Sequence, residues 1–173
     1  MTEEDNKGPG AEIVLLSNDR PLPTDLLGAA RSWRAPSWLT EWPTPTGPAD
    51  PLPVPLAEIR AQLAAVEMAL APASDEEIAV LLDPLAVIFG YPPDWHVQWP
   101  IYLEHLRPLP AYVVHDAVQA CTGLFGCRFF PKPAEIGERL PDEYREQCQA
   151  RARLRMMLRH HEWQLRWQRG RGG

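Results

Sequence analysis

Residues 74–89 read SDEEIAVLLDPLAVIF, and this stretch predicts a helix with a defined beginning. Ser74 and Glu77 are spaced as in a capping box, in which each side chain accepts a hydrogen bond from the other residue's backbone N–H. Pro84 removes one helical hydrogen bond, so we expect either a kink or a second helix capped by Asp83. The apolar residues that share one face of this helix are Ile78, Leu81, Leu82, Leu85, Ile88 and Phe89.

Helical spacing continues on both sides of this stretch. Upstream, a seam of apolar residues with steps of three and four predicts a helix that Pro72 ends. The residues of this seam are Leu56, Ile59, Leu63, Val66 and Leu70. Downstream, three further helices are expected to begin near Asp94, Pro110 and Pro133, with Pro100 confining the first of them to its second half. No alternating pattern of strand length occurs. The predicted fold is therefore all-α, a bundle of four to five short helices followed by a long C-terminal amphipathic helix.

Residues 129–133, FFPKP, form the expected closing strap of the bundle. Pro131 and Pro133 favour an extended chain at Phe129 and Phe130, and Pro133 suits the first position of a helix. Burial of each ring is worth about 2–3 kcal/mol, so we expect the two rings to clamp the last short helix onto the core. This interpretation makes the strap structural rather than catalytic.

Three parts of the chain are expected to differ in structure. Residues 1–54 form a largely irregular extension, residues 55–140 a helical domain, and residues 141–173 a basic amphipathic helix with a flexible end. Residues 21–55 contain nine of the twenty prolines, which remove backbone donors and exclude a continuous helix or a central strand. The tryptophans of the extension either dock onto the helical domain or form a short motif for a partner. These are Trp33, Trp38 and Trp42.

The composition indicates a protein with a real core and no membrane segment. The 173 residues are 45% hydrophobic, and no run of about 18 apolar residues occurs. The N-terminal residues are polar and acidic, unlike a secretion signal, so we expect a cytoplasmic protein that does not bind a membrane. The three cysteines form no CxxC pair and fit buried free thiols better than a metal site. They are Cys121, Cys127 and Cys148.

The charges are unevenly distributed along the chain. The net charge is −6, yet residues 142–173 contain eight basic and four acidic residues, against nine basic and nineteen acidic ones in the rest. This difference predicts an acidic body with a basic tail.

Residue patterns of common catalytic sites are missing from the sequence. Only two lysines occur and neither follows a glycine, which excludes a phosphate-binding P-loop of the GxxxxGK[ST] type. None of the four serines lies in a GxSxG turn. The stretch from His161 to Leu165 lacks the second histidine of a zinc-protease helix. We therefore expect a protein that is not an enzyme and that needs no cofactor and no metal.

From Asp142 to about Gln168 the spacing predicts one long helix. Its apolar stripe consists of Tyr144, Cys148, Leu154, Leu158, His161 and Leu165. The candidate partner-binding residues are Leu154, Leu158, Trp163, Leu165 and Trp167. The candidate nucleic-acid-binding residues are Arg151, Arg153, Arg155, Arg159, Arg166 and Arg169. Arginine pairs with phosphates in a planar geometry and stacks on rings, so its use here in place of lysine favours a binding role.

Three interpretations of this helix remain open. Its stripe could pack on the helical domain and leave the arginines in solvent. Alternatively, the arginines could neutralise phosphates while Trp163 or Trp167 stacks on bases. In the third interpretation the amphipathic helix docks in a groove of a protein partner.

The stretch from Ser74 to Leu140 resembles the small helical domain of bacteriophage replicative-helicase loader and inhibitor proteins. The matching elements are a helix before Tyr-Pro, a tryptophan-bearing helix, a helix with alanines and valines, and a closing Phe-Pro-Lys-Pro-Ala-Glu-Ile. The residues that carry the resemblance are Leu81, Leu82, Leu85, Phe89, Tyr91, Pro92, Trp99, Tyr102, Leu103, Leu106, Val113, Val114, Ala117, Val118 and Phe130 to Ile136. The proline-rich extension and the cationic C-terminal helix depart from the family pattern.

This resemblance implies an adaptor without ATPase activity that binds a hexameric replicative helicase and helps to load it or holds it inactive, with residues 142–169 as the contact helix. The alternative is a stand-alone phage protein, such as a regulator or a packaging subunit, that binds nucleic acid, including single-stranded DNA, through its arginine-rich helix. Self-association is a further expectation, since the seam of residues 56–70 packs either within the chain or against a second copy.

Overall fold

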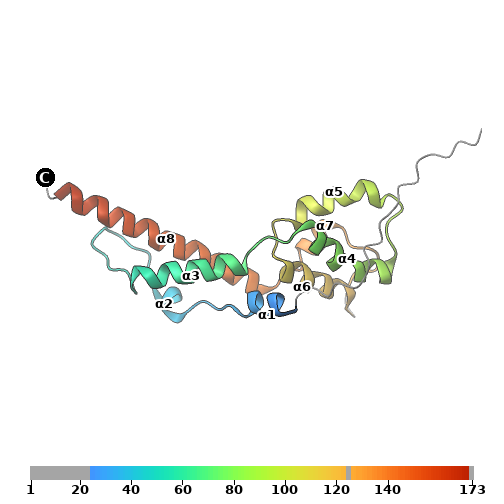
Figure 1. Cartoon of the computed structure of the whole chain (residues 1–173), viewed down its shortest axis with the longest axis horizontal. Coiled ribbons are helices and arrows are strands. Elements are labelled where there is room, and N and C mark those ends of the chain that lie inside the picture. Colours follow the sequence, from blue (N-terminus) through green and yellow to red (C-terminus); the bar gives the residue numbers. More distant parts are fainter. Residues whose placement is uncertain (1–23, 124–125, 172–173) are drawn as a thin grey trace, which may run out of the picture.

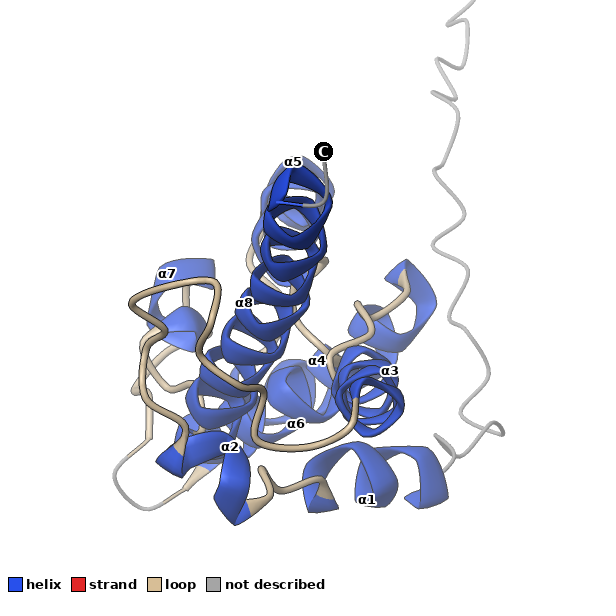
Figure 2. Ribbon diagram, turned by 90° about the vertical axis from the view of Figure 1, so that its left-hand side faces the viewer, coloured by secondary structure: helices blue, strands red, loops and turns tan. Residues whose placement is uncertain are grey.

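The computed structural model describes residues 24–123 and 126–171, and every regular element in these two ranges is a helix (Figures 1 and 2). In chain order the helices are α1 (Thr24–Ser32), α2 (Ser37–Glu41), α3 (Leu56–Ala69), α4 (Asp75–Phe89), α5 (Trp95–Leu106), α6 (Ala111–Thr122), α7 (Pro133–Gly137) and α8 (Asp142–Arg171). The prediction of an all-α fold that ends in a long helix is confirmed. None of these helices combines the length and the apolar character needed to cross a membrane.

The helices surround two hydrophobic clusters in an elongated molecule (Figure 1). Cluster 1 lies between α4, α5, α6 and α7, and cluster 2 lies between α2, α3 and α8. Helix α1 contacts both α3 and α6 and so lies between the two groups. The residues at the centre of cluster 1 include Ile78, Leu85, Val113, Val114, Ala117 and Ile136, and those of cluster 2 include Leu39, Ile59, Val66, Leu154 and Met157.

The capping box predicted at the beginning of α4 is present. The Ser74 N–H donates to Glu77 Oε2 at 2.7 Å, and the Glu77 N–H donates to Ser74 Oγ at 3.2 Å. The helix continues through Pro84 as one element, so no second helix begins there. Burial of Leu82 and Leu85 on either side of the proline holds this turn in place although one backbone hydrogen bond is missing.

Helix α5 also continues through a proline. It is helical from Trp95 onward, so the expectation that Pro100 confines it to its second half is wrong. The aromatic rings explain the difference, because Trp95 and Trp99 both pack against cluster 1 with their centroids 5.5 Å apart. These contacts anchor the first turn in spite of the missing N–H.

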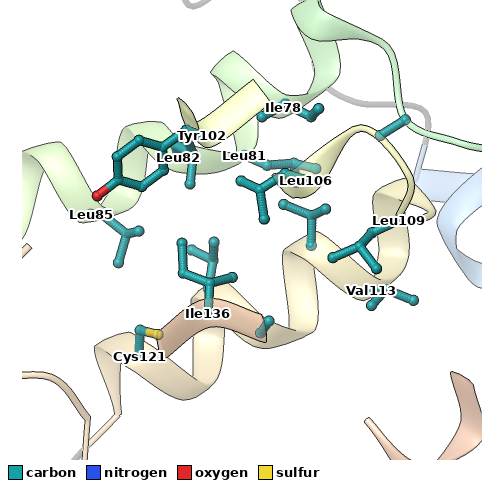
Figure 3. Close-up of a cluster of buried hydrophobic side chains, with 14 of the residues drawn as sticks. Ile78, Leu81, Leu82, Leu85, Tyr102, Leu106, Leu109, Val113, Cys121 and Ile136 are labelled. Atoms are coloured by element: carbon teal, nitrogen blue, oxygen red, sulfur yellow. The ribbon is translucent and has the colours of Figure 1, made fainter. Parts of the chain in front are cut away.

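The closing strap contributes one ring to the core instead of two. Tyr102 Oη donates to the Pro131 carbonyl oxygen at 2.6 Å, and Ile136 of α7 is fully buried among side chains from α4, α5 and α6 (Figure 3). The ring of Phe130 packs against that of Tyr102 at 5.9 Å, whereas Phe129 is 81% exposed. Consecutive residues of an extended chain point to opposite sides, so only one of the two rings faces the core.

Helix α3 packs against α8 and not, as expected, against the helices of residues 74–140. The buried residues of this pair are Ile59, Val66 and Leu70 of α3 and Ala150, Leu154 and Met157 of α8. Both sets recur at steps of three or four residues, or of seven, and therefore form matching seams. The seam of residues 56–70 is thus filled within the chain by α8.

Helix α8 is the element that both clusters share. Tyr144, near its beginning, packs against both clusters, and Gln147 is buried one turn later. Further along the same helix, Leu154 and Met157 lie within cluster 2.

The described part of the N-terminal extension belongs to cluster 2. Trp42 is 5% exposed, and Trp33 and Trp38 pack partly buried against the same cluster, which favours docking over a free motif. Two helices, α1 and α2, occur where a largely irregular chain was expected. Pro36 is the only proline of residues 24–41, which contain α1 and α2. It directly precedes α2, where a missing N–H is harmless. Residues 42–55, with their many prolines, contain no helix.

The three cysteines are free thiols. Burial raises the pKa of the Cys121 thiol to about 12, which keeps this thiol protonated. The chain returns to the same residue at Cys127, whose N–H donates to the Cys121 carbonyl oxygen at 2.8 Å. A side chain at Gly126 would lie 2.0 Å from that oxygen, so glycine is required by the close approach.

Candidate functional site: the arginine-rich end of α8

The last turns of α8, residues 159–171, extend beyond the beginning of α3 to one end of the long axis of the molecule (Figure 1). We call these residues the arginine end. They contain Arg159, Arg166, Arg169 and Arg171, opposed in this segment only by Glu162. The segment is therefore strongly cationic in a chain whose net charge is negative.

The five residues expected to bind a partner lie in different surroundings. Trp163 and Leu165 are well exposed, at 40% and 44%, and Trp167 is half-buried. Leu154 is fully buried in cluster 2, and Leu158 packs against the same cluster. The expectation that these two leucines face a partner is corrected, because their side chains stabilise the fold itself.

The six candidate arginines fall into two groups. Arg153 donates to the Trp42 carbonyl oxygen at 2.7 Å, Arg155 pairs with Glu67 at 2.6 Å, and Arg151 is half-buried. These three guanidinium groups lie along the packed part of α8. The other three are exposed and form no ion pair with a residue that the structure describes: Arg159, Arg166 and Arg169. Arg159 and Arg166 make no hydrogen bond or ion pair with a described residue that a phosphate would displace, whereas Arg169 Nε donates to the Leu165 carbonyl oxygen at 3.3 Å.

Arg159, Trp163 and Arg166 share one face of the arginine end, because they lie four and three residues apart. The Trp163 ring packs edge-on against the ring of His160, with centroids 5.9 Å apart. This contact restrains the indole while a large part of it remains exposed. A planar cation beside an exposed aromatic ring is suited to phosphates and stacked bases, and equally to an apolar groove with an acidic rim.

The proline-rich segment holds the adjoining side of the arginine end. The Asp50 carbonyl oxygen accepts hydrogen bonds from His160 Nε2 at 2.8 Å and from Gln164 Nε2 at 2.7 Å. The Asp50 carboxylate accepts the backbone N–H groups of Gly47 at 3.0 Å and Thr46 at 2.6 Å, and these bonds lower the pKa of the carboxyl group. The turn at residues 46–50 therefore fixes the carbonyl group to which α8 binds.

The sequence does not identify this contact in advance. His160 is absent from the predicted apolar stripe, yet it is 4% exposed and lies beside Trp42, with ring centroids 6.0 Å apart. Its Nε2 faces an acceptor and so carries the proton, while its buried Nδ1 has no hydrogen-bond partner. The available signal was the spacing, since His160 continues the three-residue step from Leu154 to Met157.

Cations and aromatic rings lie at the arginine end, and no group of three or more potential metal ligands gathers in the described ranges. The Arg171 guanidinium lies 4.1 Å from the centre of the Trp167 ring, which extends the cationic and aromatic surface to the last turn.

Comparisons of the chain with protein-family models, with curated proteins and with solved structures find no match in any of the three.

Proposed function

We propose that this chain is a DNA-replication adaptor that binds a hexameric replicative helicase through the arginine end of α8 and has no ATPase activity of its own. It would help to load the helicase on DNA or hold it inactive. The observation that carries the proposal is the exposed face of Arg159, Trp163 and Arg166 on a helix whose other side is anchored. Because this face is already ordered, a partner does not have to order it on binding.

The resemblance to helicase loaders and inhibitors supports the same proposal. The four segments that carry it pack together around cluster 1 and give the compact scaffold that such an adaptor would use. The sequence contains no P-loop, so any effect on the helicase would come from unequal affinity for its conformations and not from ATP hydrolysis.

The test measures binding of the labelled full chain to a purified bacterial replicative helicase. We expect binding at micromolar concentration and a loss of about tenfold, or about 1.4 kcal/mol, when Trp163→Ala and Arg166→Gln are combined. Met68→Ala is the matched control, because Met68 is 74% exposed but lies on α3. Absence of binding at micromolar concentration, or an equal loss in the control variant, would count against the proposal.

A second candidate function, binding of nucleic acid without a helicase, is favoured by the three exposed arginines that form no ion pair with a described residue. Titration of labelled single- and double-stranded DNA at two salt concentrations separates the two functions. Strong, salt-sensitive binding to DNA in a chain that does not bind helicase supports the second candidate. Helicase binding with weak DNA binding supports the first.

A truncation also tests where a partner binds. Removal of residues 1–54 would take Leu39 and Trp42 out of cluster 2 and so disturb the fold. Removal of residues 1–23 leaves every described residue of that cluster in place, and helicase binding is expected to persist. Loss of binding on this shorter truncation would move the contact from the arginine end to the beginning of the chain.

A further inference from the structure

Exposed apolar residues gather where α4 ends and α5 begins. Five large apolar side chains between residues 87 and 101 are 46–86% exposed: Val87, Ile88, Tyr91, Val97 and Ile101. We call this group the α4–α5 corner. Figure 1 shows the junction of α4 and α5 at the opposite end of the long axis from the C-terminus of α8. Single exposed apolar residues are common on protein surfaces, but two of these five, Val97 and Ile101, lie four residues apart on one face of α5 and so form a small apolar surface.

The apolar residues of α5 have acidic residues on both sides. Asp94, Val97, Ile101 and Glu104 follow one another at steps of three, four and three, so they share one face of the helix. Asp94 and Glu104 are exposed and form no ion pair with a described residue. This face therefore has an acidic group at each end and an apolar middle.

The arginine end carries the complementary arrangement. Arg159, Trp163 and Arg166 place a base on each side of an aromatic ring. At about 1.5 Å per residue, Arg159 and Arg166 lie about 10 Å apart along α8. Asp94 and Glu104 lie about 15 Å apart along α5, and the two long arginine side chains can span this difference. The net charges of the larger segments are also opposite in sign. Residues 61–141 contain ten acidic and four basic residues, whereas residues 142–173 contain four acidic and eight basic ones.

We propose that the arginine end of one copy docks on the α4–α5 corner of a second copy. The two surfaces lie at opposite ends of the molecule, so each chain in such a pair keeps one free corner and one free arginine end. A contact of this kind is heterologous and continues into an open chain of molecules or closes into a ring. Two helix faces bury little area, and the association is therefore weak and transient. It goes beyond the proposed function, because no helicase takes part in it.

Sedimentation velocity of the full chain tests the association directly. At low salt the weight-average mass is expected to rise with protein concentration. In about 1 M sodium chloride, where charges are screened beyond about 3 Å, the mass at the same concentration is expected to fall. A chain that stays monomeric at the highest soluble concentration overturns the proposal, whether or not the chain binds a helicase.

Paired variants distinguish a head-to-tail contact from a symmetric one. The corner variant carries Val97→Asp and Ile101→Asp, and the arginine variant carries Arg159→Glu and Arg166→Glu. Each variant alone is expected to remain monomeric. An equimolar mixture is expected to form a complex of two chains and nothing larger, since one intact arginine end meets one intact corner. A symmetric contact would instead let one variant associate with itself, the arginine variant through its corner or the corner variant through its arginine end. Either result, or no complex in the mixture, overturns the proposal.

A charge-exchange variant tests the same contact in case the corner variant does not fold. Asp94→Lys with Glu104→Lys alters only exposed charges and is expected to abolish association of the chain with itself. Mixing this variant with the arginine variant described above is expected to restore association beyond two chains, since arginine end and acidic corner pair again and so do the new glutamates and lysines. Met68→Asp, on α3, is the control and should associate like the unchanged chain. Equal loss in the control, or no complex in the mixture, overturns the proposal.

Discussion

Tyr112 of α6 donates a hydrogen bond from its hydroxyl group to Gln147 Oε1 of α8 at 2.6 Å, and both residues are almost completely buried. The amide nitrogen of Gln147 donates in turn to the carbonyl oxygens of Ala30 at 3.0 Å and Trp33 at 3.3 Å. One polar side chain therefore links a helix of cluster 1, the helix shared by both clusters and the chain at the end of α1. An isolated polar group in the interior is costly, so this link should couple the two clusters.

We expect Gln147→Leu to lower the free energy of unfolding by about 2–3 kcal/mol, because it leaves buried polar groups without partners. Tyr112→Phe removes only the hydroxyl group and should cost about 1–2 kcal/mol. Urea denaturation of both variants and of the double variant measures the coupling. A double variant whose loss equals the sum of the two single losses would show that the hydrogen bond contributes no coupling.

His160→Ala should release residues 42–55 from α8. The substitution removes a hydrogen bond to the Asp50 carbonyl group and the contact with the Trp42 ring, at an expected cost of about 2 kcal/mol. Limited proteolysis should then cleave residues 42–55 faster. His161→Ala is the neighbouring control, because His161 is half-buried and forms no hydrogen bond with a described residue. Similar cleavage rates in both variants would refute the assigned role of His160.

Ser74→Ala should destabilise the protein by about 1 kcal/mol, because the Glu77 N–H at the beginning of α4 loses its acceptor. Thermal unfolding followed by circular dichroism gives the difference in stability. Ser37→Ala provides the comparison, since Ser37 begins α2 but makes no capping hydrogen bond. If the two variants unfold alike, the capping box has no measurable effect.

The Asp75 carboxylate should make stability depend on acid pH. Arg107 Nε donates to Asp75 Oδ1 at 2.6 Å, and this hydrogen bond lowers the pKa of the carboxyl group below its usual value of 3.8. The folded-state pKa is depressed, so the stabilisation is present above pH 3.8 and is lost as the pH falls through the lowered pKa. Melting temperatures at several acid pH values should fall less steeply for Asp75→Asn than for the unchanged chain. If the melting temperatures of both proteins fall equally with pH, the Asp75–Arg107 pair does not contribute to stability.

The two groups of arginines should differ in DNA titrations. Arg166→Gln is expected to lower the slope of log affinity against log salt concentration by about 0.7–0.9, the contribution of one phosphate contact. Arg153→Gln should leave that slope unchanged and lower the melting temperature instead, because its guanidinium group binds the Trp42 carbonyl oxygen. Fluorescence anisotropy at several salt concentrations makes the measurement. Equal changes in slope for both variants would contradict the separation of the arginines into an exposed group and a group with internal contacts.

Local patterns predicted the helices well because their causes lie within a few residues. The capping box of Ser74 and Glu77 lies where the spacing placed it, and Pro133 is the first residue of α7. Prolines inside the helices were less informative. Pro84 and Pro100 each remove one hydrogen bond, but burial of neighbouring side chains outweighs that loss, and burial depends on the whole fold.

The pairing of helices could not be predicted in the same way. A seam such as that of residues 56–70 identifies the face that will be buried but not the helix that covers it. Many seams share the same spacing, so the sequence does not tell whether α4, α6 or α8 covers the apolar face of residues 56–70. The buried face of α8 also differs from the predicted stripe. The residues it buries are Gln147, Ala150, Leu154, Met157 and His160, and of these only Leu154 belongs to the predicted stripe.

Helix α8 contacts cluster 1 near its beginning and fills cluster 2 further along, with no break between. Deleting or inserting one residue between Gln147 and Leu154 would rotate everything beyond that point by about 100° and carry the arginines toward the interior. Length changes in a divergent lineage should therefore be eliminated by selection in this part of α8.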